Sequence, residues 1–241
     1  ITSVNGDLST YSRNPVTINA KASGNGISKL QIHVDKVSST GTLLQADVAL
    51  GDVTTCTTTP CTSLTSTFSW TPDCGTGDSS YFKARAVATN SCGNESTTSP
   101  EHLFRVYKSY NLDITTKLMN SALLPSATPN CSDTSSNKTG ITVAASSTDV
   151  AVPYSSGNVV SNSSGIVSLT KIPEKVGSLS VDANLTGSQC SLYNHYCTND
   201  ATKTPITIST TGADCTTQKA SITMAETKRK SWETVIDGNV Y

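Results

Sequence analysis

Apolar and polar residues alternate with a period of two in several segments of the first half of the chain. This pattern places one side of each segment in a core and the other in solvent, as in the strands of antiparallel sheets. Turn sequences at residues 14–15, 24–26 and 75–78 separate the segments. Residues 1–108 are therefore predicted to form a β-sandwich of short strands. The apolar positions that define the strands are Val16, Ile18, Ala20 and Ala22; Leu30, Ile32 and Val34; Leu64, Phe68 and Trp70; Phe82, Ala84, Ala86 and Ala88; and Phe104 and Val106.

The second half repeats this pattern with a different sequence, and glycines separate its segments. Residues 109–226 are predicted to form a second β-sandwich, with residues 107–113 as a short joint. Residues 227–241 are expected to be a linker or the start of a further strand or domain. The apolar strand positions of this half are Ile141 and Val143; Val150 and Val152; Val167 and Leu169; Leu179, Val181, Ala183 and Leu185; Ile206 and Ile208; and Ile222 and Met224.

The composition argues against nucleic acid and membrane insertion. The 241 residues carry a formal net charge of −1, and 15% are charged and 5% aromatic. This balance provides no basic surface for nucleic acid, and no apolar run reaches the ~18 residues that span a bilayer. The chain begins at Ile1 without a Met, which predicts a processed product or a segment of a longer chain.

The 8 cysteines are divided evenly between the two halves. An even count in a chain rich in Ser and Thr predicts paired disulfides, which persist outside the reducing cytosol. The chain is therefore predicted to be extracellular or displayed on a cell surface. Zinc binding is the alternative, but no Cys-x2-Cys pair occurs and the nearest histidine is His195. The cysteines predicted to form disulfides are Cys56, Cys61, Cys74, Cys92, Cys131, Cys190, Cys197 and Cys215.

The spacing of the cysteines favours two local loops closed by disulfides, Cys56–Cys61 and Cys190–Cys197. This leaves Cys74–Cys92 in the first half and Cys131–Cys215 in the second. Four cysteines in each half allow three pairings, so the alternatives stay open. In the chain-entropy model, the long Cys131–Cys215 loop would contribute on the order of 4 kcal/mol to stability.

Residues 16–23 (VTINAKAS) and 26–35 (GISKLQIHVD) have the pattern of a strand, a tight turn and a strand, and residues 68–72 (FSWTP) precede a long strand at 82–90. In these features the first half resembles the bacterial Ig-like repeats of large surface proteins. The resemblance implies an Ig-like sandwich that serves as a spacer or adhesive unit. The cysteines depart from the family pattern, because most such repeats lack disulfides.

Residues 162–170 (NSSGIVSLT), the Ile172-Pro173 pair and residues 179–183 (LSVDA) are similar to the core of carboxypeptidase-regulatory or Cna-B sandwiches. Some members of that family form a Lys–Asn isopeptide bond with the help of an acidic residue. The acidic motif after the Ile-Pro turn is missing here, and Glu174 is the nearest candidate. Disulfides are expected to stabilise this half instead. The predicted fold class is all-β, with two tandem antiparallel Ig-like and Cna-B-like sandwiches carrying disulfides.

Motifs of catalysis and of phosphate binding are absent from the sequence, including the Gly-x-Ser-x-Gly elbow and the Walker loop. His33 alternates with Ile32 and is expected on a polar face. Asp47 and Asp52 lie close in sequence, as do Asp182 and Asn184, and either pair could contact a calcium ion between domains. No EF-hand spacing occurs, and solvated side chains are the favoured interpretation. The chain is therefore predicted not to be an enzyme and to carry no cofactor and no metal.

The loop between Cys190 and Cys197 is the candidate recognition loop. Tyr193, His195 and Tyr196 lie within it, and a disulfide would present them rigidly; packing within the loop is the alternative. Five Asn-x-Ser/Thr sequons also occur, and the candidate glycosylation sites are Asn94, Asn137, Asn162 and Asn184. The fifth sequon, at residue 130, directly precedes a cysteine that is expected to form a disulfide.

Together these features predict a structural module of an extracellular or cell-surface fibre, adhesin or filament. It would act in cell adhesion or assembly as a disulfide-stabilised rigid spacer. The expected partners are other copies of itself or neighbouring domains of a longer chain, through edge strands or the segments 1–4 and 235–241. The alternatives are a module that binds a surface carbohydrate or protein, and an accessory domain of a larger secreted enzyme.

Overall fold

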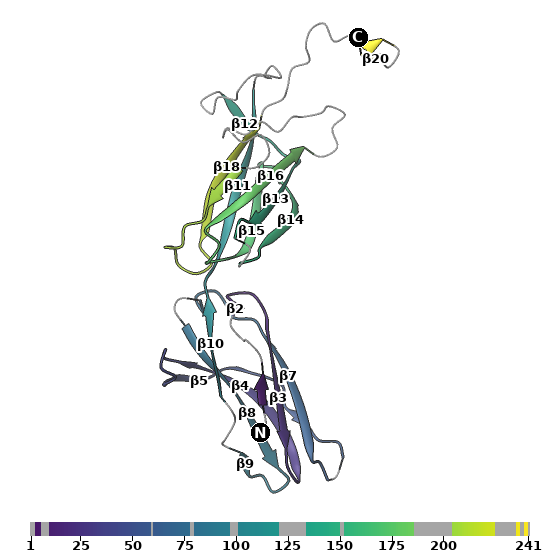
Figure 1. Cartoon of the computed structure of the whole chain (residues 1–241), viewed down its shortest axis with the longest axis vertical. Coiled ribbons are helices and arrows are strands. Elements are labelled where there is room, and N and C mark those ends of the chain that lie inside the picture. The colour runs from purple at the N-terminus through teal and green to yellow at the C-terminus, as the bar shows by residue number, and fades with distance from the viewer. Residues whose placement is uncertain are drawn as a thin grey trace. The chain divides into compact units, whose positions relative to one another are not determined.

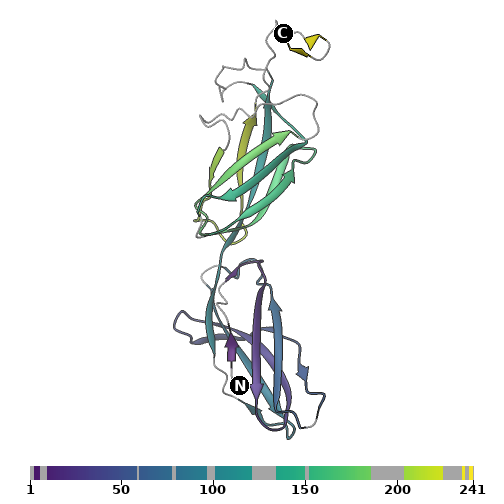
Figure 2. The ribbon, with the colours of Figure 1, turned by 45° about the vertical axis from the view of Figure 1, so that its right-hand side comes forward.

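In a computed structural model the chain forms two units, each built from β-strands (Figures 1 and 2). Unit 1 consists of Ile1–Ser109 with Ala213–Cys215, and unit 2 of Tyr110–Gly212 with Thr216–Tyr241. Within the described residues every regular element is a strand, so the predicted all-β class with tandem sandwiches is confirmed. No helix among them is long and apolar enough to cross a membrane. The structure describes residues 3–5, 10–58, 60–77, 80–96, 101–120, 134–149, 152–185, 204–224, 235–236 and 239–240.

Unit 1 contains two sheets that face each other. Its strands are β1 (Ser3–Asn5), β2 (Thr10–Tyr11), β3 (Val16–Ser23), β4 (Ile27–Val37), β5 (Leu43–Leu50), β6 (Thr54–Thr55), β7 (Ser63–Trp70), β8 (Ser80–Asn90), β9 (Glu95–Ser96) and β10 (His102–Tyr107). The smaller sheet has the order β1-β3-β7, and the larger has the order β2-β10-β8-β4-β5, with β6 beside β4 and β9 beside β8. Neighbouring strands are antiparallel except β2 and β10, which are parallel.

The core of unit 1 lies between its sheets because alternate residues of strands such as β3 and β4 point inward. Along β3, buried and exposed residues alternate without interruption. The ring of Trp70 on β7 lies 5.1 Å from that of Phe82 and 6.1 Å from that of Phe104, so the predicted core position of Trp70 is confirmed. Each such aromatic pair contributes about 0.5–1.5 kcal/mol beyond the apolar area that it buries.

Unit 2 also contains two facing sheets. Its strands are β11 (Ser109–Met119), β12 (Ser135–Asn137), β13 (Ile141–Ser147), β14 (Ser155–Val160), β15 (Ile166–Pro173), β16 (Ser178–Leu185), β17 (Thr204–Thr207), β18 (Thr217–Met224), β19 (Val235–Ile236) and β20 (Asn239–Val240). In one sheet β11 pairs with β12, β15 and β18, and the other has the order β14-β13-β16-β17. The last two strands pair only with each other in the described residues.

The core of unit 2 is formed by the inward residues of both sheets and includes Tyr110 at the start of β11. This side chain is fully buried, and its hydroxyl donates to the Thr210 carbonyl at 2.9 Å. Strands β11 and β18 run parallel, in register from Asn111 with Thr217 to Leu118 with Met224. The buried tyrosine and the long parallel pair therefore tie the start of unit 2 to its last core strand.

Several expectations from the sequence need correction. The chain passes from unit 1 to unit 2 between Ser109 and Tyr110, within the joint predicted at 107–113, and most of this stretch is the strand β11 rather than an irregular linker. Val152 lies in the connection before β14 rather than in a strand. Strand β5 was not predicted, because most of its residues are exposed and show no apolar alternation. The sheets also contain two parallel pairs, which alternation cannot distinguish from antiparallel ones.

Candidate functional site

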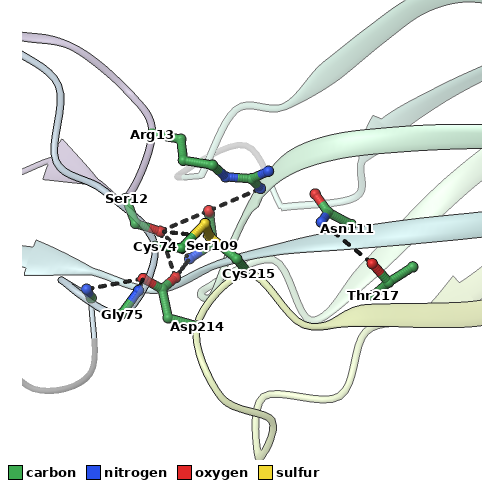
Figure 3. Close-up of a disulfide and its surroundings, with 10 residues drawn as sticks. Ser12, Arg13, Cys74, Gly75, Ser109, Asn111, Asp214, Cys215 and Thr217 are labelled. Carbon is green, nitrogen blue, oxygen red and sulfur yellow. Dashed lines mark hydrogen bonds between the residues drawn. A yellow bond between two sulfur atoms is a disulfide. The ribbon is translucent and has the colours of Figure 1, made fainter.

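A disulfide joins Cys74 to Cys215, with 5.6 Å between their Cα atoms (Figure 3). Cys74 lies in the connection between β7 and β8, and Cys215 in the connection between β17 and β18. The two residues are 141 positions apart in sequence. Residues 213–215 therefore belong to unit 1, although the chain on both sides of them belongs to unit 2.

This pairing overturns the predicted Cys74–Cys92 and Cys131–Cys215 disulfides. Cys74 precedes β8 and Cys92 follows it, and a strand of 11 residues separates their loops by roughly 35 Å. A disulfide needs Cα atoms within about 7 Å, so the predicted pair is geometrically excluded. Cys92 is exposed and unpaired in the described part of the chain. Cys131, Cys190 and Cys197 lie outside the described residues, as does their predicted pairing.

The predicted local disulfide between Cys56 and Cys61 is confirmed. Their Cα atoms are 6.3 Å apart, and the loop that they close lies between β6 and β7. Cys61 is buried, and its carbonyl accepts a hydrogen bond from the Ile27 amide at 3.2 Å. This second disulfide therefore fixes the start of β4 against the loop that leads into β7.

The carboxylate of Asp214 is buried beside the Cys74–Cys215 disulfide and accepts hydrogen bonds from four neutral groups. The Ser12 hydroxyl and the Ser109 amide donate to Oδ1, the latter at 2.9 Å. The amides of Gly75 and Gly77 donate to Oδ2 at 2.8 and 3.1 Å. Backbone N–H groups that converge in a turn are a recognised environment for a carboxylate. Asp214 thus joins three segments of unit 1 that are distant in sequence.

The groups around Asp214 are themselves tightly placed. Ser12 and Ser109 are fully buried, and their hydroxyl oxygens lie 2.8 Å apart. Arg13 donates from Nη2 to the Ser109 hydroxyl at 3.3 Å. A Cβ on Gly77 would lie 2.6 Å from the Tyr107 carbonyl oxygen, so only glycine fits there. We name this assembly the Asp214 node; its members are Ser12, Cys74, Gly75, Gly77, Ser109, Asp214 and Cys215.

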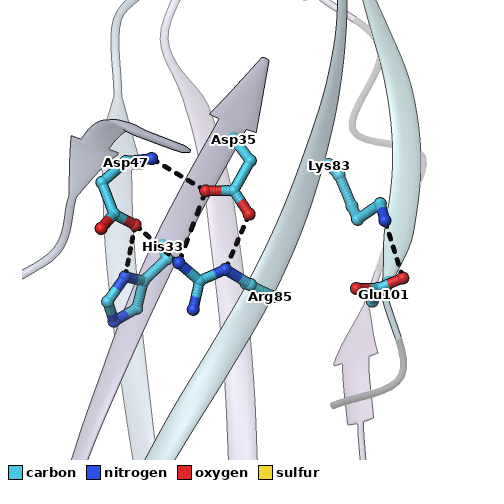
Figure 4. Close-up of polar contacts among 6 residues, drawn as sticks. All are labelled: His33, Asp35, Asp47, Lys83, Arg85 and Glu101. Atoms are coloured by element: carbon cyan, nitrogen blue, oxygen red, sulfur yellow. Dashed lines mark hydrogen bonds and ion pairs between the residues drawn. The ribbon is translucent and has the colours of Figure 1, made fainter. Parts of the chain in front are cut away.

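A second polar cluster lies on the outer face of the larger sheet of unit 1 (Figure 4). Arg85 on β8 donates from Nε to Asp35 Oδ2 and from Nη2 to Asp47 Oδ1, both at 2.7 Å. The Nδ1 atom of His33 on β4 lies 2.7 Å from the same Asp47 oxygen. These four side chains form what we name the Arg85 cluster. His33 therefore lies on the polar face, as predicted from its alternation with Ile32.

Asp47 reaches this cluster because β5 is bulged. Its pairing with β4 shifts register between Val34 and Val37, and Asp47 has a positive φ of 54°. Aspartate tolerates this left-handed conformation better than most residues. The Asp47 amide donates to Asp35 Oδ1 at 2.8 Å. Burial alone would raise the pKa of Asp35, but the hydrogen bonds from Arg85 and this amide, with the charges of Arg85 and His33, lower that pKa below its ordinary value.

The Arg85 cluster borders a polar groove with a volume of about 490 Å³. Its lining combines amide, hydroxyl, imidazole, ammonium and carboxylate groups, so it offers both donors and acceptors at the surface. No group of side chains suited to hold a metal ion occurs among the described residues, and Asp47 is engaged by Arg85 and His33 instead. The lining residues are Lys29, Gln31, His33, Asp47, Val53, Arg85, Val87, Thr89 and Glu95.

The other predicted site residues fall in different places. Tyr193, His195 and Tyr196 lie outside the described residues, as does the side chain of Asn184. Asn94 and Asn162 are exposed in connections between strands, and Asn137 is exposed in β12. The Asn162 Oδ1 accepts from the amides of Ser164 and Ile166, and the Asn137 Nδ2 donates to the Ser164 carbonyl at 3.2 Å. The Asn137 nitrogen that a glycan would modify is therefore already a hydrogen-bond donor.

Sequence reasoning missed Asp214 and Arg85, which organise the two clusters. The available signal for Asp214 was its position directly before a cysteine in a loop rich in Ser, Thr and Gly. The signal for Arg85 was its place between Ala84 and Ala86, opposite His33 on the neighbouring strand. Neither signal identifies the residues that Asp214 and Arg85 contact, because both clusters depend on which strands and loops lie side by side in the fold.

No protein-family model matches the chain, and no curated protein matches it. BcpA, the major pilin subunit of Bacillus cereus, is 13% identical with a TM-score of 0.35, over 91% of this chain and 67% of BcpA. The Bacillus anthracis TIE protein is 11% identical with a TM-score of 0.32, over 91% of this chain and 39% of TIE. The major pilin protein T-13 of Streptococcus pyogenes is 8% identical with a TM-score of 0.21, over 87% of this chain and 97% of T-13. At TM-scores below 0.5, these similarities carry no argument about family or function.

Proposed function

We propose that this chain is a structural module of an extracellular or cell-surface fibre or adhesin, in which it acts as a disulfide-stabilised spacer. The observation that carries the proposal is the Asp214 node. There a segment from late in the chain is held to unit 1 by a covalent bond and by the hydrogen bonds of a buried carboxylate. Such a bond forms and lasts in oxidising surroundings, outside the cytosol.

The composition of the surface supports the same role. Exposed strand residues are mostly Ser, Thr and Asn rather than charged residues, as in β3 and β7. These uncharged polar side chains keep the surface hydrated. They create no strong electrostatic field whose strength would change with pH or salt. The role requires durability and no chemical reaction, so we assign no catalytic residue.

Assembly with other copies or with neighbouring domains is part of this proposal. Strand β1 pairs with β3 inside unit 1, in register from Ser3 with Lys21 to Asn5 with Asn19. The segment 1–4 is therefore partly engaged within its own unit. Strand β5 pairs only with β4 among the described residues, so its outer edge offers backbone groups to another strand.

The proposal is tested by locating the protein on cells of its source organism. Antibodies raised against the purified chain should label intact cells by immunogold electron microscopy, on surface structures and without permeabilisation. Replacing Cys74 and Cys215 by Ser should reduce the amount displayed, because chains that unfold are degraded. Replacing Cys56 and Cys61 is the matched control and should have the smaller effect. Label that appears only after permeabilisation would contradict the proposal.

A binding role is the second candidate, and the polar groove beside the Arg85 cluster is the observation that favours it. A carbohydrate would find both hydrogen-bond donors and hydrogen-bond acceptors in this groove. A glycan array with the purified chain tests this role, with His33→Ala as the groove variant. The variant Tyr193→Ala/Tyr196→Ala tests the predicted recognition loop separately. Binding lost in only one variant would locate the site, and no binding would remove this candidate.

A further inference from the structure

We infer that the Cys74–Cys215 disulfide is a mechanical bypass that keeps residues 75–214 off the path of a pulling force. A load applied before Cys74 and after Cys215 passes through the disulfide, because the bond is the shortest covalent route between these points. The bypassed segment contains β8, β10 and every strand of unit 2 from β11 to β17. This inference deepens the proposed structural role, on which its biological meaning rests.

The first part of the chain that carries load after the disulfide is already extended. Cys215 leads into β18, a strand of 8 residues. A strand rises 3.2–3.4 Å per residue, and a fully stretched chain reaches only about 3.3–3.6 Å per residue. Pulling on β18 therefore adds almost no length, even if its pairing with β11 breaks. Most of unit 2 contributes nothing to the extension of an oxidised chain.

A second, non-covalent closure precedes the disulfide. The Arg13 amide donates to the Pro72 carbonyl at 2.6 Å, and the Ser12 amide donates to the Tyr107 carbonyl at 2.8 Å. The Ser12 hydroxyl also donates to Asp214. A force that arrives from the N-terminal side first meets the pairing of β1 with β3, and once that pairing breaks it meets the Asp214 node before the chain from Asn14 onward carries load. Residues 14–71 lengthen only after these hydrogen bonds break, whereas residues 75–214 lengthen only after a covalent bond breaks.

The local disulfide Cys56–Cys61 provides an internal comparison. It bypasses a sequence separation of 5, against 141 for Cys74–Cys215. Both disulfides stabilise the folded chain by a covalent bond between two of its loop residues. Only the long one removes a large share of the chain from extension, so the two predict different changes in stretched length.

Single-molecule force spectroscopy on the full chain, tethered at its two ends, measures this length. At roughly 3.6 Å per residue, the oxidised chain should extend to a contour length of about 35 nm, and the Cys74→Ser/Cys215→Ser variant to about 85 nm. Disulfides among the cysteines outside the described residues would shorten the second value. The control Cys56→Ser/Cys61→Ser should add only about 2 nm to the oxidised chain.

The unmodified chain gives an independent measurement if the double variant fails to fold. Held under constant force after unit 1 has unfolded, it should lengthen in one step of up to about 50 nm when a thiol reductant is added, and should not do so without reductant. Equal lengths for the oxidised chain and the double variant, or no step with reductant, would overturn the bypass. Failure of surface labelling would instead remove the fibre role and leave these lengths unchanged.

Discussion

Unit 1 holds two aspartates buried to a similar degree but in opposite chemical settings. Asp214 is 9% exposed and receives only neutral donors, three of them backbone amides. Asp35 is 4% exposed and lies against the guanidinium of Arg85. The partners of Asp214 are 105 to 202 positions away in sequence, whereas those of Asp35 lie on adjacent strands of one sheet.

The difference separates two uses of a buried carboxylate. Asp214 fixes distant backbone segments to one another, because backbone amides cannot move away without unfolding their loops. Asp35 joins side chains across strands that the sheet already pairs, and Arg85 and Asp47 remain partly exposed. The Asp214 node therefore determines which distant segments of the chain are held together. The Arg85 cluster only arranges side chains on one face of a sheet. Four changes test this comparison, from the largest expected effect to the smallest.

Removal of the disulfide at the Asp214 node should have the largest effect. In the chain-entropy model, a loop with a sequence separation of 141 contributes about 5 kcal/mol, and one with a separation of 5 contributes about 2 kcal/mol. Chemical denaturation of Cys74→Ser/Cys215→Ser, compared with Cys56→Ser/Cys61→Ser, measures both losses. A larger loss from the local pair would show that the node does not stabilise unit 1 as described.

Substitution of Asp214 should come next. Asp214→Ala leaves the buried donors of Ser12, Gly77 and Ser109 without their acceptor and should lower the free energy of unfolding by about 3 kcal/mol. Asp214→Asn keeps one acceptor oxygen and should lose about half as much. Asp52→Ala, at an exposed position, is the control and should change stability by less than about 0.5 kcal/mol. Equal losses for Asp52 and Asp214 would refute the description of the node.

Replacement of Arg85 should have a smaller effect, because its side chain is 27% exposed and water can reach the vacated position. Arg85→Ala leaves Asp35 without its cation and should lower stability by about 1–2 kcal/mol after allowance for solvent screening. Lys83→Ala, two residues earlier on the same strand, removes the exposed pair with Glu101 and should lower stability by at most about 0.5 kcal/mol. Thermal unfolding of both variants decides whether the Arg85 cluster contributes more to stability than an ordinary surface ion pair.

The two regions also differ in how far the sequence predicts them. Strands such as β3 and β4 follow from alternation, because a single buried face leaves a period of two in the chain. Strand β5 does not, since its bulge at Asp47 and its exposed leucines break that period. Trp70 was placed correctly in the core from its parity with Phe68. The Asp214 node could not be predicted, because local spacing contains no information on which loops meet across 141 positions.

The acid sensitivity of unit 1 provides the smallest and most specific test. Hydrogen bonds and the positive charges of Arg85 and His33 outweigh burial and lower the pKa of Asp35. A carboxyl whose pKa is lowered on folding contributes stability above its unfolded value, near 3.9, and loses that contribution as the pH falls through the folded value. As the pH is lowered below about 4, the free energy of unfolding should therefore decrease, and it should decrease less steeply in Asp35→Asn.

The control Lys83→Ala leaves Asp35 and its hydrogen-bond donors in place and should keep the original slope. An unchanged slope in Asp35→Asn would show that Asp35, despite its setting beside Arg85, does not couple folding to pH.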